Sequence, residues 1–294
     1  MTTDPSAPPA ASRLITIAPV LFGASSFACA DVLSKVTFRA GGDPLTVSTL
    51  RGVIGLAVLF VWIRLAKLPS FIARREKTIA LGLGIVFAAN VFLLFVAIQA
   101  IEVAVAILTY FIYPLLTGIA AAVVGLEKLS WRGLLAAGFA FVGLGMMLGA
   151  HPAGLALAGV LAAVAAASCR VVLLLVTRAT MRQADPVSMT LYSMISSTVL
   201  FVAASVVTLN WQPPLTVSGW LAVIGLSVFV MTGILGVFAS TMRIGPFRTA
   251  LFMNLEPLLT AIGSAAFLGE LITPLQALGG GVMIVALTVF QLRR

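Results

Sequence analysis

Long apolar stretches separated by short polar segments run along almost the entire chain. Each stretch has about the 20 apolar residues that a helix needs to cross the hydrocarbon core of a membrane. None of them shows the strict alternation of a barrel strand, so the pattern predicts an all-α polytopic membrane protein. Turn residues rich in Gly, Pro and Asp separate the stretches. The ten predicted transmembrane helices are residues 14–38, 45–64, 78–98, 103–125, 133–150, 154–177, 187–209, 217–241, 247–268 and 272–292.

The composition excludes a water-soluble globule. Hydrophobic residues make up 61% of the 294 positions and charged residues 9%, and the mean hydropathy is +1.16, whereas soluble domains carry about 25% charged residues. Residues 1–13, rich in Pro, Ala and Ser, are expected to form a disordered cytoplasmic tail. Residues 14–27 followed by Ala28-Cys29-Ala30 resemble a cleaved signal peptide. Because a matching segment recurs later in the chain, we expect this one to be retained.

Positive charge gathers on one side of the predicted topology. The chain has 18 Lys and Arg against 9 Asp and Glu, a net charge of +9. The two termini and alternate connections hold fourteen of these basic residues, the other connections hold Arg39 alone, and three lie within spans. Both termini are therefore expected in the cytoplasm, with Glu102 and His151 outside. The basic residues are dispersed and form no stripe, which argues against a nucleic-acid partner.

The two halves of the sequence repeat one another. The matching segments are residues 114–117 with 257–260 and Glu127 with Glu270 at an offset of 143, Cys29 with Cys169 at 140, and Asp43-Pro44 with Asp185-Pro186 at 142. The chain therefore divides into two five-helix repeats, residues 14–150 and 154–292. Because five is odd, the second repeat enters the membrane from the opposite side. Inverted repeats around a central cavity are characteristic of secondary transporters that work by alternating access.

Motifs within these repeats resemble a known family. Tyr113-Pro114 and Glu256-Pro257 lie in the fourth helix of each half, and Gly269-Glu270 follows the second of them. Over nearly the whole chain, this pattern resembles the drug/metabolite transporter (DMT) superfamily, and within it the EamA-type exporters. The resemblance implies a basket of helices around a central cavity in the bacterial inner membrane. The segment 247–270 is similar to exporters of aromatic amino acids and methyl viologen, which implies export of small amphipathic metabolites.

Aromatic and polar side chains recur at matching places in the two fourth helices. At helical spacing, Tyr110, Tyr113 and Thr117 share one face, and the repeat places Met253, Glu256 and Thr260 on the equivalent face. Aromatic rings on such a face favour Phe- or Trp-like solutes. The residues expected to border the cavity are Tyr110, Tyr113, Asn254, Glu256 and, as a weaker candidate, Asn90. For the two amides, interhelical hydrogen bonding is the alternative.

Pro114 and Pro257 are the expected flexing points of these helices. Each proline lacks an N–H and frees the carbonyl four residues earlier, on Tyr110 and Met253 respectively. A kink without a role in transport is the alternative. Glu256 lies near the membrane midplane, where an ionisable side chain usually faces a cavity or a partner. It could bind a substrate amine, carry a proton, or bond to the freed backbone.

Four further charged residues lie inside the predicted spans and are candidate charge pairs. Asp31 and Lys35 are spaced i,i+4 and can pair within one helix, with Arg51 at a similar depth. Arg170 is the natural partner for Glu256. Asp31, Lys35 and Arg51 are expected to be structural or to line the outer vestibule, with direct coupling to transport as the alternative, and Arg170 lies nearer the cytoplasmic end of its helix.

No motif supports catalysis. His151 is the sole histidine, so a His-based metal cluster or catalytic triad is not expected. There is no phosphate-binding Gly-x-x-x-x-Gly-Lys-Ser/Thr loop, so no cofactor is expected and transport is expected to use gradients. A membrane-embedded enzyme, a lipid-handling protein and a channel remain alternatives, and monomer and homodimer stay open. Glycines at matching places in the fifth and tenth helices, including Gly143 and Gly279, predict close packing of these helices with each other or with a second subunit.

Overall fold

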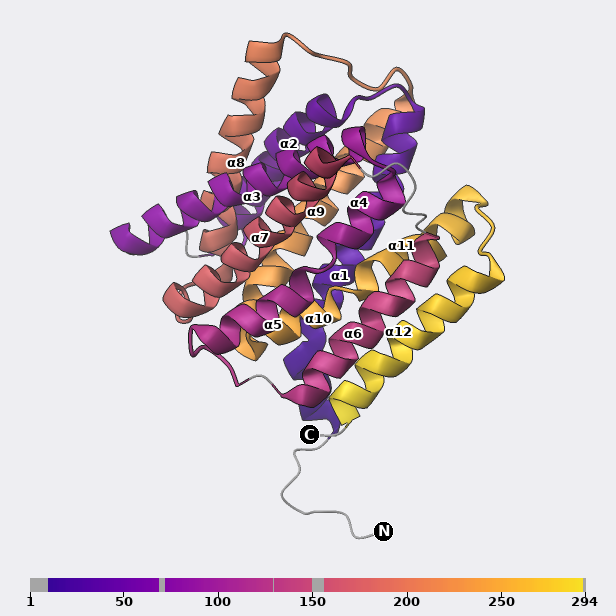
Figure 1. The fold of residues 1–294 in the computed structure, drawn as a ribbon. Coiled ribbons are helices and arrows are strands. Elements are labelled where there is room, and N and C mark those ends of the chain that lie inside the picture. The colour runs from indigo at the N-terminus through magenta and orange to yellow at the C-terminus, as the bar shows by residue number, and fades with distance from the viewer. Residues whose placement is uncertain (1–9, 69–71, 129, 150–155, 293–294) are drawn as a thin grey trace.

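The computed structural model describes residues 10–68, 72–128, 130–149 and 156–292, and all secondary structure in these ranges is helical. The helices are α1 (Ala10–Arg39), α2 (Pro44–Leu65), α3 (Arg74–Ala100), α4 (Val103–Tyr110), α5 (Tyr113–Val123), α6 (Trp131–Leu148), α7 (Leu157–Thr180), α8 (Pro186–Thr208), α9 (Val217–Ile244), α10 (Pro246–Phe252), α11 (Leu255–Leu268) and α12 (Pro274–Leu292) (Figure 1). The described residues do not include residues 1–9 of the predicted tail, nor His151.

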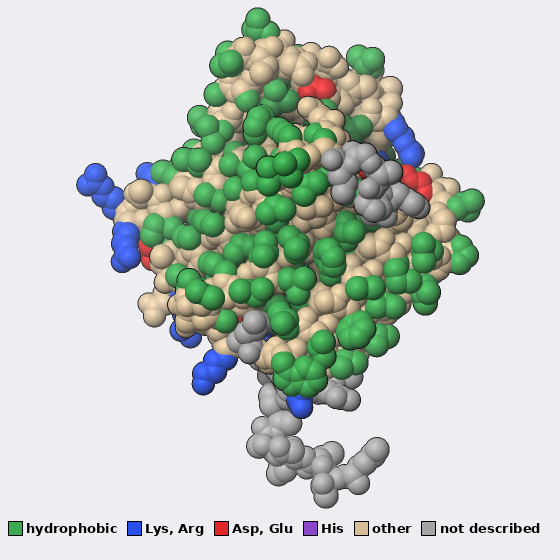
Figure 2. All heavy atoms as spheres, in the orientation of Figure 1, with side chains coloured by type: hydrophobic (Ala, Val, Ile, Leu, Met, Phe, Trp, Pro, Cys, Tyr) green, Lys and Arg blue, Asp and Glu red, His purple; other side chains and the backbone are tan. Residues whose placement is uncertain are grey.

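The predicted ten-helix membrane architecture is confirmed. The pair α4–α5 forms one broken span and the pair α10–α11 another. Within the described ranges, nine spans are long and apolar enough to cross a membrane, and the apolar helix from Pro274 to Phe290 follows them. Figure 2 shows hydrophobic side chains over most of the visible face and Lys and Arg mainly at its edges.

Equivalent Asp-Pro pairs start the second helix of each half. The Asp43 carboxylate accepts hydrogen bonds from the Leu45 and Thr46 N–H groups at 2.9 and 3.2 Å. Asp185 accepts one from the Ser188 N–H at 2.8 Å. The following prolines need no hydrogen-bond acceptor for their nitrogen at the first helical position. The repeated dipeptide therefore acts as the same start signal in α2 and α8.

The helix pairing follows the sequence repeat. In the first half α1 packs against α9 and α11, and in the second half the equivalent α7 packs against α3 and α5. The contact of α2 with α9 is matched by that of α8 with α3, while α6 packs on its own equivalent, α12. Each of these pairings therefore occurs twice or joins equivalent elements, as expected for two halves related by a two-fold pseudosymmetry.

Glycines permit the close contact between α6 and α12. A Cβ atom on Gly143 of α6 would lie 2.5 Å from the carbonyl oxygen of Gly279 on α12, and one on Gly279 would lie 2.4 Å from that of Gly143. Only residues without a side chain allow such an approach. The predicted packing of the fifth and tenth helices against each other is confirmed.

The α8–α9 connection reaches the α1–α2 turn at the side of the molecule away from the two termini (Figure 1). There the Asp43 N–H donates to the Gln212 carbonyl at 3.1 Å, and the Leu215 N–H donates to the Ala40 carbonyl at 2.8 Å. These bonds join the α1–α2 turn to the α8–α9 connection and fix one rim of the basket.

Candidate functional site

A cavity of about 780 Å³ lies between the two repeats. Its walls come from α1, α4 and α11, and its mouth is bordered by Phe38, Glu102 and the α11–α12 connection at Glu270. The carboxyl end of α1 and the α11–α12 connection lie at the side opposite the termini in Figure 1. The base of the cavity reaches the breaks in the two fourth spans, where Tyr110 and Glu256 line it.

The break between α4 and α5 is filled with aromatic rings. The ring centroids of Tyr110, Phe111 and Tyr113 lie 5.4 to 5.6 Å apart. Tyr110 and Phe111 line the cavity, whereas the Tyr113 side chain is 1% exposed and lies outside its lining. Pro114 lies at the start of α5, where its missing N–H costs little. The rings therefore form a floor with Tyr110 above and Tyr113 beneath.

The break between α10 and α11 exposes a carboxylate. Without an N–H at Pro257, the Met253 carbonyl accepts the Glu256 N–H at 3.0 Å instead. Asn254 is buried at the break and donates from Nδ2 to the Leu251 carbonyl at 2.9 Å. Its amide therefore caps the end of α10, and of the two polar residues Glu256 is the one that faces the cavity.

Asp31 of α1 faces α11 from the opposite wall of the cavity. The Thr260 hydroxyl lies 3.1 Å from the Asp31 Oδ2 and 2.9 Å from the carbonyl oxygen of Glu256. Because Asp31 and Glu256 both line the cavity, two carboxylates share its deeper part.

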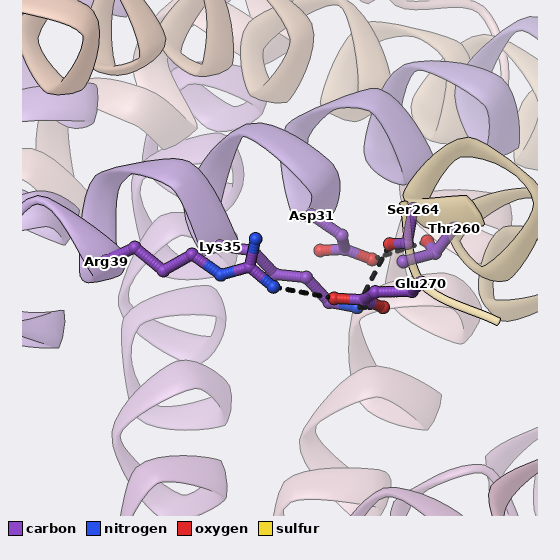
Figure 3. Close-up of polar contacts among 6 residues, drawn as sticks. All are labelled: Asp31, Lys35, Arg39, Thr260, Ser264 and Glu270. Atoms are coloured by element: carbon purple, nitrogen blue, oxygen red, sulfur yellow. Dashed lines mark hydrogen bonds and ion pairs between the residues drawn. The ribbon is translucent and has the colours of Figure 1, made fainter. Parts of the chain in front are cut away.

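Lys35, Arg39 and Glu270 form a charge cluster at the cavity mouth (Figure 3). The Lys35 Nζ donates to the Glu270 Oε2 at 2.6 Å and to the Ser264 Oγ at 3.0 Å. Arg39 donates to the Glu270 Oε1 at 3.0 Å. The Lys35 hydrogen bond, together with the positive charges of Lys35 and Arg39, outweighs the opposing effect of burial and holds the pKa of Glu270 below its ordinary value.

This cluster corrects the predicted Asp31–Lys35 pair. The long Lys35 side chain reaches outward to a more solvated carboxylate, and Asp31, one turn deeper, bonds to Thr260. Sequence reasoning gave Glu270 no site role. The available signals were the Gly269-Glu270 motif and the match between Glu270 and Glu127 in the repeat.

Arg170 lies beneath the aromatic floor. Arg170 is 7% exposed, and its guanidinium carbon lies 5.8 Å from the ring centroids of both Phe27 and Tyr113. Its Nε has no hydrogen-bond partner among the described residues. The predicted pair with Glu256 is not a direct ion pair, because Tyr113 packs at the guanidinium, although the two charges are within electrostatic range.

The other two polar predictions fall in the helix packing. Asn90 is buried and donates from Nδ2 to the Ala166 carbonyl at 2.6 Å, which ties α3 to α7. This is the interhelical alternative foreseen for it. Arg51 of α2 lies among Ser48, Ser197 and Thr198 and is within electrostatic range of Asp31.

A second hollow, of about 900 Å³, lies on the outside of the molecule between α6 and α12. Apart from Ser130 and Arg132 at one end, its lining is apolar, and several of its side chains are exposed, including Phe139 and Val285. Such a surface suits contact with lipid chains. In the described parts of the chain, no three His, Cys, Asp or Glu residues are grouped so that they could hold a metal ion.

Comparison with known proteins identifies the family. The model of the EamA-like transporter family matches residues 14–149 and again residues 157–291. A solved crystal structure is similar over 94% of this chain and 99% of its own, with a TM-score of 0.78 and 19% identity, which shows a shared fold. No curated protein matches. The resemblance drawn from the repeat motifs is thus confirmed at the level of the family: the chain belongs to the EamA-like transporters of the drug/metabolite transporter superfamily, multi-pass membrane proteins that move small molecules and are not enzymes.

Proposed function

We propose that this transporter exports small amphipathic metabolites, above all amino acids with aromatic side chains, by alternating access. The observation that carries the proposal is the composition of the cavity, which combines the rings of Tyr110 and Phe111 with the carboxylates of Asp31 and Glu256. Rings offer stacking and apolar contact, and carboxylates offer partners for an ammonium group. A volume of about 780 Å³ is in the range of small-molecule sites.

Sequence similarity supports the same substrate class. The overall length, the short connections and the segment 247–270 resemble YddG, a bacterial inner-membrane exporter of aromatic and other amino acids and of methyl viologen. We place the protein in the bacterial inner membrane on this basis. Because basic residues mark the termini as cytoplasmic, the cavity described here opens to the outside.

Cationic drugs are the second candidate class. Two carboxylates in one cavity favour an organic cation such as methyl viologen, which the aromatic floor could also stack against. We favour amino acids because Arg51 and Arg170 lie near these carboxylates and bring the charge of the inner region to balance.

Counterflow in proteoliposomes of the purified protein tests the proposal. Radiolabelled phenylalanine, leucine and methyl viologen are offered to vesicles preloaded with the same unlabelled solute. We expect accumulation of phenylalanine above that in protein-free vesicles, with leucine weaker. Counterflow of methyl viologen alone would identify cationic drugs as the substrate class. Absence of counterflow for every amino acid would refute amino-acid export.

A further inference from the structure

Four charged side chains lie deep between the repeats without closing an ion pair. Asp31 and Glu256 are acidic, and Arg51 and Arg170 are basic. None of the four makes an ion pair within 4.0 Å to another described residue, whereas Lys35 and Arg39 pair with Glu270 at the cavity mouth. A buried charge is costly unless it is paired and hydrogen-bonded. The deep charges are therefore close enough to balance one another yet keep bonding capacity for a ligand.

The repeat relates the acidic and basic sides of this region. At the offset of 140, Arg170 of α7 matches Ala30, the neighbour of Asp31 on α1. Asp31 faces Thr260 on α11, whereas Arg170 lies at Tyr113 on α5, two helices that the repeat also makes equivalent. The two halves thus offer equivalent half-sites of opposite charge, one with carboxylates and one with a guanidinium.

Only the acidic half-site reaches the cavity in this structure. Asp31 and Glu256 line it, whereas Arg170 lies beneath the Tyr113 ring and outside the lining. When inverted repeats exchange conformations, the half-site that was covered becomes the one that is open. The buried Nε of Arg170, which lacks a partner, is then available, and a guanidinium is well shaped for a carboxylate.

We propose that Arg170 is the anion-binding, specificity-determining residue of the transport site, and that Asp31 and Glu256 form its cation-binding side. A zwitterion is held by both ends, with its carboxylate at Arg170 and its ammonium at the two acidic residues. This rests on the proposed export of amino acids. It also assigns Tyr113 a position between Arg170 and the substrate in the state that is open to the outside.

A series of three ligands tests the assignment. Phenylalanine, phenethylamine and 3-phenylpropionate share the ring but differ in the charged ends, and each competes with radiolabelled phenylalanine in counterflow. We expect both analogues to compete at least about tenfold more weakly than phenylalanine with the wild-type protein, because each leaves a polar group of the site unpaired. In Arg170→Gln, the affinity for phenylalanine should fall to that for phenethylamine. The affinity for phenethylamine itself should not change.

The matched variants distinguish binding from structure. Glu256→Gln should lower the affinity for phenylalanine and leave the affinity for 3-phenylpropionate unchanged. Arg170→Lys should give an affinity for phenylalanine between those of the wild-type protein and Arg170→Gln, because lysine keeps the charge without the planar fork. Equal loss for all ligands in Arg170→Gln would mean a structural role and overturn the proposal. Should that variant fail to fold, the wild-type series decides, because equal competition by phenethylamine and phenylalanine also overturns it.

Failure of the proposed function gives a different pattern. The wild-type protein would then move no amino acid but would move another solute from a wider panel. A transported solute that carries an anionic group, with transport weakened by Arg170→Gln, keeps the assignment of Arg170 and replaces only the substrate. A transported solute without an anionic group overturns both.

Discussion

The two halves break their fourth span at equivalent positions but put different side chains there. In the first half, α4 ends at Tyr110 and α5 begins at Tyr113. In the second half, α10 ends at Phe252 and α11 begins at Leu255. A proline in the first turn of the second segment accompanies each break. The first break is sealed by aromatic rings, while the second presents the Glu256 carboxylate to the cavity.

This difference shows that the repeat determines the course of the backbone, whereas single side chains determine which of the two breaks is sealed. The Tyr113 ring packs against neighbouring rings and a guanidinium, so it can be buried. A carboxylate in the same place needs water or a cation, and Glu256 therefore lies at the cavity wall. A sealed break and an open break should therefore differ in thiol accessibility, in stability and in response to substitution.

Thiol accessibility should differ completely between two threonines that the repeat makes equivalent. Thr260 of α11 lines the cavity, whereas Thr117 of α5 is 0% exposed. In a background with Cys29 and Cys169 changed to serine, Thr260→Cys should react with a membrane-impermeant thiol reagent from the outside, and Thr117→Cys should not. Labelling of oriented vesicles measures this.

Glu102→Cys is the control for orientation, since Glu102 is exposed at the cavity mouth. It too should react from the outside. Reaction of Glu102→Cys and Thr260→Cys from the cytoplasmic side alone would invert the topology, and equal reaction of both threonine variants would erase the contrast between the breaks.

Removing the lower ring of the aromatic floor should cost far more stability than removing the upper one. Tyr113 is buried on all sides, so Tyr113→Ala should lower the free energy of unfolding by about 3 kcal/mol or more. Tyr110→Ala should cost less, because the Tyr110 ring already borders the cavity. Unfolding in mixed micelles gives both values, with Tyr113→Phe as the control that keeps the ring. Equal losses for the two alanine variants would contradict a sealed first break.

Hydrophobic pattern and turn residues were enough to predict the helices, because a membrane helix must satisfy its own backbone. The predicted bounds of the second and seventh helices, 45–64 and 187–209, differ by one residue at each end from those of α2 and α8. Pro114 and Pro257 each lie in the first turn after a break, and their role as flexing points stays a prediction. Membership of the family also followed from the repeat and its motifs.

The placement of side chains at the site was less accessible to sequence reasoning. The expectation that Tyr110 and Tyr113 share a face assumed a continuous helix, and the break between them changes the register, so that one ring lies above the other. Lys35 bonds to Glu270, a residue 235 positions away that local spacing cannot bring into view. Partner choice between distant segments depends on packing, and the i,i+4 rule describes only neighbours on one helix.

Glu256→Gln should lower affinity without changing the response to a proton gradient. The neutral amide loses a charged contact to the substrate amine, and we expect this loss to lower the affinity for phenylalanine about tenfold. We expect movement to be facilitated and uncoupled, so the ratio of uptake with and without an imposed pH gradient should stay the same in the wild-type protein and the variant. Uptake in proteoliposomes measures the ratio. A gradient response that disappears only in Glu256→Gln would make this carboxylate the proton carrier.

The smallest change in stability should come from the charge cluster at the cavity mouth, which joins α1 to the α11–α12 connection. Because the Lys35 hydrogen bond and the nearby cations hold the pKa of Glu270 below its ordinary value, the ionised form stabilises the fold. That stabilisation is complete above the ordinary carboxyl pKa of about 4.3 and is lost as the pH falls through the lowered value.

Thermal unfolding of the wild-type protein and of Glu270→Gln, recorded from about pH 6 to about pH 3, isolates this contribution from the other carboxylates. The difference between the two midpoints should be at most about 2 °C at the higher pH, because half-exposed ion pairs contribute little. It should shrink towards zero at the lower pH and in high salt, which screens exposed charges. Glu102→Gln is the control, since Glu102 lies at the same mouth but outside the ion pairs of the described residues. A midpoint difference that is the same at every pH would show that Glu270 acts through packing and that its charge does not hold α1 in place.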